Sequence, residues 1–269
     1  MLGNKVVIKP SAKEDIKNFQ FRINNKIPFC FIRYSDGEME IIRNRYLKIN
    51  QGQTYFKGKV FKNSFSEIDS KEFNPKLNND LREDLLISSI SRMSKFYKGM
   101  PHKRFKEDRD LLVTIHGGLD GHITFADLLI NSNYKFFREK ILPNFEKYKD
   151  IFLIANYRAK PIGIFSKAEH LKIPDNFFSD YQNVKKDILN KLFNIPSGSL
   201  VLSSASSLSN IIGYKLFNFR KDITFIDVGT AINDLISLET ITRSYHETYF
   251  SKGLKPILRK LRPSFYIRW

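Results

Sequence analysis

Hydrophobic residues occur along the chain in two patterns, as short continuous runs and as longer stretches with helical spacing. Short runs of apolar and aromatic residues are typical of buried β-strands, because both faces of such a strand are covered. Apolar positions that recur every three or four residues predict amphipathic helices instead. The expected strands cover residues 29–34, 111–115, 150–155, 199–202 and 223–228. The expected helices cover residues 11–27, 39–46, 79–97 and 125–141, and a further helix ends at Leu216.

Strands alternate with helices over most of the chain. This order predicts an α/β fold, Rossmann-like, with a mostly parallel sheet and helices on both faces. No internal repeat, low-complexity tract or Pro/Gly-rich linker divides the sequence. We therefore expect one domain over residues 1–247 and a basic amphipathic C-terminal segment over residues 248–269.

Four turns rich in polar or small residues fall directly after expected strands. They cover residues 35–38, 116–118, 203–209 and 227–230. In an open parallel sheet, ligands bind beyond the carboxyl ends of the strands. These four turns are therefore the candidate functional segments.

Asp36 and Glu38 lie two residues apart around Gly37 in the first of these turns. The spacing allows both carboxylates to bind one hard cation, such as Mn²⁺ or Mg²⁺, while Gly37 permits a tight turn and the close approach of a phosphate. The same residues also fit a helix start, with Asp36 as the N-cap and Glu38 and Glu40 in the first turn. Taken alone, this short pattern favours capping.

The turn at residues 203–209 consists mostly of small hydroxyl residues. It has neither the lysine of a P-loop nor the spaced glycines of a dinucleotide site. The hydroxyls of Ser204 and Ser206, together with free backbone N–H groups at a helix start, suit a pyrophosphate or a sugar hydroxyl. Ordinary N-capping by either serine is the alternative.

Two carboxylates and two histidines complete the candidate groups. Asp227 ends an expected strand, and Asp234 follows in the same region. Either can act as a general base, or can instead cap a helix or pair with Arg243. His116 and His122 flank a glycine-rich loop, where imidazoles can bind a metal or move protons, although two histidines without a third ligand more often do neither. A nucleophile elbow is absent from the sequence, which argues against an esterase.

The chain has 269 residues, of which 42% are hydrophobic, and its formal net charge is +17. This length and apolar content suffice for an ordinary core and exclude a disordered protein. Cys30 is the single cysteine, so an intramolecular disulfide and a thiolate zinc cluster are excluded and a reducing compartment is expected. Because we find neither a membrane-spanning stretch nor a secretory signal, we expect a cytoplasmic protein.

The positive charge favours polyanionic partners, although the abundance of Lys, Asn, Ile and Phe indicates that part of it reflects AT-rich codons. After Glu247 the sequence has no acidic residue, and basic residues alternate there with large apolar ones. This segment predicts either peripheral contact with an anionic inner membrane surface or a C-terminal helix packed on the domain. A nucleic-acid partner is not expected, because no binding module is recognisable.

Several segments together are similar to a known family. FIRYSDGEMEII resembles the R-[FY]-G-D-G-E motif of the bacterial glycosyltransferases with the GT-D fold, the DUF1792-related group, with Ser35 in place of the first glycine. HLKIPDNFFSDYQNV resembles a connecting segment of that group, and LVLSSASSLSNIIGYKLF resembles its strand, small-residue turn and helix. FIDVGTAINDLI and TRSYH are similar to its two later motifs. The matches keep their order along the chain.

The resemblance implies that Asp36 and Glu38 hold a divalent cation, usually Mn²⁺, against the diphosphate of a nucleotide sugar. Arg33 would orient that turn or neutralise phosphate. The remaining donor-binding positions implied are Gly37, Ser204, Ser206, Gly229 and Tyr245. The catalytic positions implied are Asp227, Asp234 and Arg243, with Asp234 as the candidate base of an inverting reaction.

The activity implied is metal-dependent transfer of a hexose from a nucleotide diphosphate sugar to a cell-surface glycan, glycolipid or glycoprotein. A UDP-sugar is the expected donor. A metal-dependent phosphatase or other hydrolase that uses the same carboxylates is the alternative, and a nucleic-acid-binding protein ranks below both.

Overall fold

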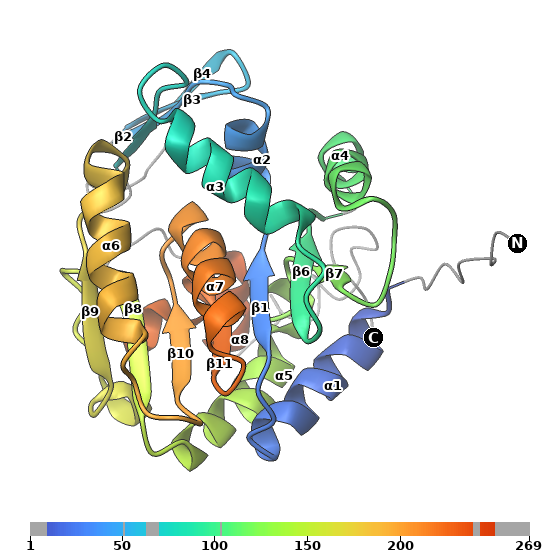
Figure 1. Cartoon of the computed structure of the whole chain (residues 1–269), viewed down its shortest axis with the longest axis vertical. Helices are drawn as coiled ribbons and strands as arrows, with labels where there is room; N and C mark the ends of the chain where they lie inside the picture. The colour runs from blue at the N-terminus through green and yellow to red at the C-terminus, as the bar shows by residue number, and fades with distance from the viewer. Residues whose placement is uncertain (1–9, 51, 63–69, 103, 239–242, 251–269) are drawn as a thin grey trace, which may run out of the picture.

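A computed structural model describes residues 10–50, 52–62, 70–102, 104–238 and 243–250. At its centre is a seven-stranded sheet in which neighbouring strands are parallel (Figure 1). In spatial order the strands are β7 (Ile123–Phe125), β6 (Phe96–Met100), β1 (Cys30–Arg33), β11 (Thr224–Asp227), β10 (Leu200–Ser203), β8 (Ile151–Asn156) and β9 (Glu169–Ile173). This parallel sheet confirms the predicted α/β class.

Helices cover both faces of the sheet, as the alternating sequence pattern predicts (Figure 1). On one face lie α3 (Asn79–Ile90), α4 (Lys106–His116), α6 (Tyr181–Leu192) and α7 (Ser207–Phe219). On the other lie α1 (Ala12–Asn24), α5 (Tyr134–Phe136) and α8 (Ser244–Phe250), with the short turns η2 (Asn131–Asn133), η3 (Phe137–Ile141), η4 (Leu142–Lys147) and η7 (Gly229–Leu235). Two further 3-10 turns are η5 (Gly163–Phe165) and η6 (Phe177–Asp180).

Strand β1 packs against hydrophobic side chains on both sides. Cys30 and Ile32 belong to the core on one face, Phe31 belongs to the core on the other, and all three are fully buried. Gly213 lets α7 approach the sheet closely, because a Cβ there would lie 2.7 Å from side-chain atoms of Ile32 and Phe225. The apolar run that predicts this strand is therefore a consequence of burial on both faces.

A small antiparallel sheet lies at the end of the molecule toward which the parallel strands point (Figure 1). Its strands, in spatial order, are β4 (Lys59–Lys62), β3 (Gln53–Phe56), β2 (Leu47–Asn50) and β5 (Lys71–Phe73). The short helix α2 (Asp36–Ile42) connects β1 to this sheet. The sequence does not predict these strands, because they are short and mostly half-buried or exposed and so lack an apolar run.

The strand predicted at residues 111–115 is wrong, since these residues form the end of α4. A short apolar run by itself does not distinguish a buried strand from a helix. The signals of a helix are present on both sides of the run. Glu107 and Asp108 lie in the first turn, and Gly117 follows the last helical residue with φ of +85°.

The helix predicted at residues 79–97 ends at Ile90, and β6 follows it. The sequence of β6 does not look like a buried strand because Lys98 lies at its centre. Lys98 is nevertheless fully buried, and its ammonium group reaches the backbone oxygens of Ser89 and Ser91 at 2.6 and 2.5 Å. The helix predicted at residues 125–141 is also wrong at its start, where β7 ends and short irregular turns follow.

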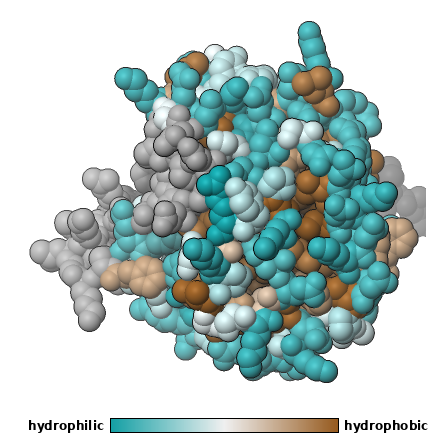
Figure 2. Space-filling model, turned by 90° about the vertical axis from the view of Figure 1, so that its left-hand side faces the viewer, coloured by the Kyte–Doolittle hydropathy of each residue, from teal (hydrophilic) through white to brown (hydrophobic). Residues whose placement is uncertain are grey.

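Strand β9 forms one edge of the parallel sheet. Glu169 and Lys172 are exposed there while Leu171 and Ile173 are buried, and charged residues of this kind discourage pairing with a further strand. Figure 2 views this side of the molecule, whose surface is mostly hydrophilic with hydrophobic side chains visible between the polar ones.

Among the described helices, none is both long enough and apolar enough to cross a bilayer. Residues 251–269, which contain most of the basic C-terminal segment, lie outside the described residues. The division of the chain at residue 247 therefore stays a prediction.

Candidate active site at the carboxyl ends of the strands

A cavity of about 450 Å³ opens at the carboxyl ends of the parallel strands. Every strand of the large sheet contributes a lining residue at or just beyond its carboxyl end. The cavity therefore lies where a ligand site is expected in a parallel sheet. The lining residues at the carboxyl ends of β1, β6, β7, β8, β9, β10 and β11 include Asp36, His102, Asp127, Asn156, Asp175, Ser206 and Gly229. Three of the four predicted turns meet here.

A buried ion pair between neighbouring strands forms the floor of this site. Arg33 Nη2 lies 3.0 Å from Asp227 Oδ1, and the side chains are 15% and 5% exposed. Burial raises the pKa of Asp227, while the Arg33 guanidinium and backbone donors oppose the rise. Asp227 therefore pairs with Arg33, not with Arg243 as one of the sequence alternatives allowed.

Gly229 makes room for this ion pair. Its φ is +48°, and its N–H donates to Asp227 Oδ1 at 3.1 Å. A Cβ at this position would lie 1.7 Å from Arg33 Nη2, a distance that no real contact has. Only glycine fits both the backbone conformation and the space that the guanidinium occupies.

The turn at residues 35–38 combines the two functions that the sequence left open. Ser35, rather than Asp36, is the N-cap of α2, and its N–H donates to Glu38 Oε2 at 3.0 Å, which is half of a capping box. Asp36 is exposed at the first helical position and accepts from the N–H of Gly37 at 3.1 Å. Both carboxylates also line the cavity. Capping and ligand binding are therefore compatible in this turn.

Glu38 is 7% exposed, and the negative charges of other acids act on its carboxylate. Burial raises its pKa, and the negative charges of Asp227 and Asp36 add to the rise. Each carboxylate oxygen carries two lone pairs, so the bond from Ser35 leaves capacity for a further partner. An oxygen-only pair of carboxylates fits a hard divalent cation, whose charge would stabilise the ionised form of Glu38.

The serine turn after β10 contacts the acidic turn directly. Ser206 is the N-cap residue of α7, yet its side chain makes no capping bond and its hydroxyl lies 3.3 Å from Glu38 Oε1. Its φ of +50° is unusual for a residue other than glycine. The N–H of Ser204 donates to Ile154 O at 2.8 Å, so at Ser204 the side chain, not the amide, is available to a ligand. The strained backbone of Ser206 is of a kind that is common at functional sites.

Of the residues in the last two sequence motifs, some line the cavity and others lie outside its lining. Arg243 and Tyr245 line the cavity, and the Tyr245 hydroxyl bonds to that of Thr230. Asp234 is not among the lining residues. Its carboxylate pairs with Arg138 at 2.8 Å and accepts a long bond from the Tyr134 hydroxyl at 3.5 Å. Its predicted role as the base is not tested by this arrangement and stays a prediction.

Asp127 is a site residue that the sequence interpretation missed. It follows β7, lines the cavity and is 5% exposed. Its Oδ2 accepts a long bond from Asn131 at 3.5 Å, and its Oδ1 has no hydrogen-bond partner within the described ranges. Burial raises its pKa, and the neighbouring His102 opposes the rise. Had β7 been recognised as a strand, the strand-end rule would have selected Asp127.

The fourth predicted turn, at residues 116–118, lies at the end of α4 instead of a strand end. His116 and His122 do not line the cavity. His116 is the last residue of α4, and His122 lies in the loop between α4 and β7. Asp120 of the same loop lies beside both and is a third potential ligand.

No protein-family model matches the chain, and no curated protein matches its sequence. Three solved structures are similar in fold. One, a glycosyltransferase (DUF1792) from Streptococcus sanguinis, is 13% identical with a TM-score of 0.51, and the match covers 80% of each chain. A structure of the domain of unknown function 1792, described as having a distinct glycosyltransferase fold, is 14% identical with a TM-score of 0.52 and covers 82% of this chain and 77% of its own.

A selenomethionine structure of the same domain is 14% identical with a TM-score of 0.51, and the match covers 82% of this chain and 83% of that one. At these identities the similarity concerns the fold. The chain thus has the fold of the DUF1792 glycosyltransferase structures, which confirms the fold that the sequence motifs imply.

Proposed function

We propose that this protein is a metal-dependent glycosyltransferase that moves a hexose from a nucleotide diphosphate sugar, such as a UDP-sugar, to a hydroxyl of a glycan, glycolipid or glycoprotein. One observation carries the proposal. In a fold shared with glycosyltransferase structures, the acidic turn Asp36–Gly37–Glu38 and the Arg33–Asp227 pair line one cavity at the strand ends.

The donor diphosphate would bind between the acidic turn and the serine turn. Asp36 and Glu38 would hold Mn²⁺ or Mg²⁺, which when bound neutralises charge on the leaving diphosphate. Arg33 and Arg243 supply fixed positive charge along the cavity wall, and the hydroxyls of Ser204 and Ser206 supply hydrogen-bond donors. Both arginines would favour the charge that develops on the leaving group.

Transfer requires a base for the acceptor hydroxyl. As the acceptor oxygen bonds to the anomeric carbon and the bond from that carbon to the diphosphate breaks, the hydroxyl proton passes to a carboxylate. We propose Asp127 for this role beside the earlier candidate Asp234, because Asp127 lines the cavity and its Oδ1 has no protein partner among the described residues. A raised pKa brings a carboxylate closer to the working pH of a general base.

The two candidates for the base can be separated by amide substitutions. Asp127→Asn keeps the shape of the side chain and should lower kcat by roughly 100-fold or more, with little change in KM for the donor. Asp234→Asn serves as the matched variant and should lower kcat by less than about tenfold. If Asp234→Asn shows the larger loss in kcat, the base is Asp234 and the assignment to Asp127 is wrong.

The experiment for the site as a whole is donor turnover in Asp36→Ala and Glu38→Ala. Both variants should lose Mn²⁺-dependent release of nucleotide diphosphate while circular dichroism shows an intact fold. Asp110→Asn removes an exposed carboxylate on α4 and is the control, with turnover expected to stay at the wild-type level. Unchanged turnover in both cavity variants would contradict the metal-site proposal.

The cellular setting follows from the same proposal. An acceptor assembled at the inner face of the membrane would suit a cytoplasmic enzyme whose basic segment contacts anionic lipid. The basic residues concerned fall within residues 252–268, outside the described part of the chain, so this remains an expectation from the sequence.

A further inference from the structure

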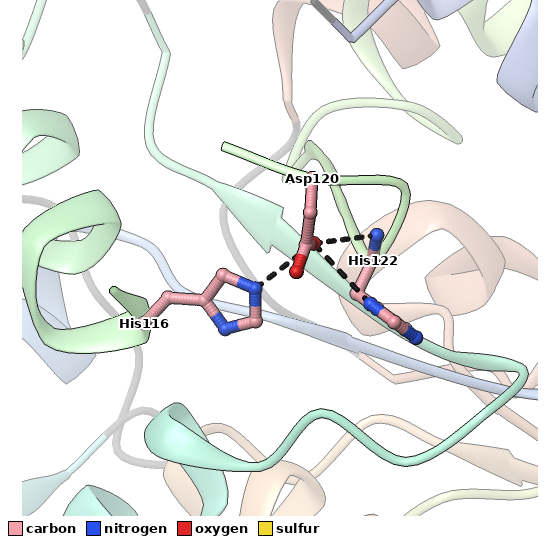
Figure 3. A group of neighbouring side chains, drawn as sticks. All are labelled: His116, Asp120 and His122. Atoms are coloured by element: carbon pink, nitrogen blue, oxygen red, sulfur yellow. Dashed lines mark hydrogen bonds and ion pairs between the residues drawn. The ribbon is translucent and has the colours of Figure 1, made fainter. Parts of the chain in front are cut away.

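His116, Asp120 and His122 form a compact group (Figure 3), and none of the three lines the cavity. Asp120 Oδ1 lies 2.9 Å from His116 Nε2 and 3.3 Å from His122 Nδ1. The three potential ligand atoms all lie within 4.8 Å of one another. Ligands at about 2.0–2.1 Å from a tetrahedral metal ion are separated by about 3.3 Å, so the two shorter distances are close to those of a metal centre.

The local backbone creates this convergence. His116 ends α4, and Gly117 and Gly118, with φ of +85° and +112°, reverse the chain immediately afterwards. Asp120 then accepts from the N–H of His122 at 2.9 Å. The oxygen of His122 accepts from the N–H of Lys98 at 2.7 Å, which fixes this residue beside β6. The side chains of three residues close in sequence therefore meet at the Asp120 carboxylate.

The ring of His116 is fixed from its other side. Lys98 Nζ lies 2.6 Å from His116 Nδ1, and its remaining partners are the backbone oxygens of Ser89 and Ser91. Nζ donates to both backbone oxygens, and its contact with Nδ1 holds the ring in place with Nε2 beside Asp120.

His122 supplies an independent observation. Its Nδ1 is buried and has no hydrogen-bond partner among the described residues, although the aspartate lies 3.3 Å away. A buried nitrogen of this kind is normally satisfied by protein, water or an ion. Figure 3 shows this ring nitrogen facing the same carboxylate that His116 contacts.

We propose that His116, Asp120 and His122 bind a divalent transition-metal ion of the Zn²⁺ type, at a second site separate from the acidic turn. Two imidazoles and one carboxylate are the ligands of a borderline ion, whereas Asp36 and Glu38 offer oxygen alone. Three protein ligands leave a fourth position for water. The ion would join the end of α4 to the start of β7, the strand that leads to Asp127 in the cavity.

The test is Co²⁺ binding to the full chain, freed of any affinity tag and of metal, in an Asp36→Asn/Glu38→Gln background. Co²⁺ replaces Zn²⁺ in such sites, and its visible absorption reports four-coordinate geometry. We expect one equivalent of Co²⁺ to bind with this absorption, and Zn²⁺ to displace it. The altered acidic turn ensures that the result does not depend on the proposed transferase activity.

Two further variants assign the binding to the cluster. His122→Gln, at a half-buried position, and Asp120→Asn should each abolish stoichiometric Co²⁺ binding while circular dichroism stays unchanged. His170→Ala removes a histidine on β9 and should bind Co²⁺ as its parent does. The proposal would be overturned if the parent protein binds no stoichiometric Co²⁺. It would also be overturned if the His122→Gln and Asp120→Asn variants bind as much Co²⁺ as the parent.

Discussion

At the scale of single residues, Gly229 is the described glycine at which an added Cβ would collide most closely with a neighbour. Its backbone lies in the left-handed region and its missing side chain leaves room for the Arg33 guanidinium, which holds Asp227. A side chain here would force Arg33 away and leave a buried carboxylate without its partner, an arrangement that costs about 3–5 kcal/mol when it cannot relax.

Gly229→Ala should therefore lower both the stability and the donor turnover of the protein. Gly58→Ala is a matched control, because Gly58 has φ of +74° and nothing near its absent Cβ, so this variant carries the backbone strain without the collision. Urea unfolding should show a loss of about 1–2 kcal/mol for Gly58→Ala and a clearly larger loss for Gly229→Ala. Equal losses in the two variants would refute a steric role for the contact with Arg33.

At the scale of elements, a polar contact joins α1 to β7. The Asp15 carboxylate accepts a hydrogen bond of 2.6 Å from the Thr124 hydroxyl. Burial raises the pKa of Asp15 from 3.8 to about 6, with a smaller contribution from the charge of Glu14. Because the pKa is higher in the folded protein than in the unfolded chain, this group destabilises the fold as the pH rises from about 4 to about 6, and the cost stays constant above that range.

Asp15→Asn should remove this cost while keeping an acceptor for Thr124. We expect a gain in unfolding free energy of about 1–3 kcal/mol at pH 7, which shrinks toward zero near pH 4. Glu14→Gln, an exposed change in the same turn, should alter stability by less than about 0.5 kcal/mol. Urea denaturation at the two pH values measures both, and a gain for Asp15→Asn that is equal at pH 4 and pH 7 would contradict the assigned cause.

The burial and length of each strand explain which strands the sequence could predict. Strands β1, β8, β10 and β11 are buried on both faces, so their apolar runs are visible without a structure. Strand β6 has a buried lysine at its centre, and its hydrogen bonds to α3 and to His116 are not visible in the sequence. Asp127 was missed for a related reason, because β7 is too short to produce a pattern.

At the scale of the whole molecule, the fold places turns from distant parts of the chain around one cavity. The acidic turn and the serine turn are 168 residues apart between Glu38 and Ser206, yet their side chains lie 3.3 Å apart. Motif spacing predicts each turn separately, and the parallel order of β1, β11 and β10 explains why they meet.

Transferase activity is measured directly as turnover of nucleotide diphosphate sugars with Mn²⁺, in the presence and absence of acceptor glycans. We expect the wild-type protein to release nucleotide diphosphate much faster with an acceptor and the hexose to appear on the acceptor. Asp36→Ala and Glu38→Ala should abolish both. Donor hydrolysis at the same rate without an acceptor would favour a hydrolase, and turnover that survives in both variants would contradict the proposed site.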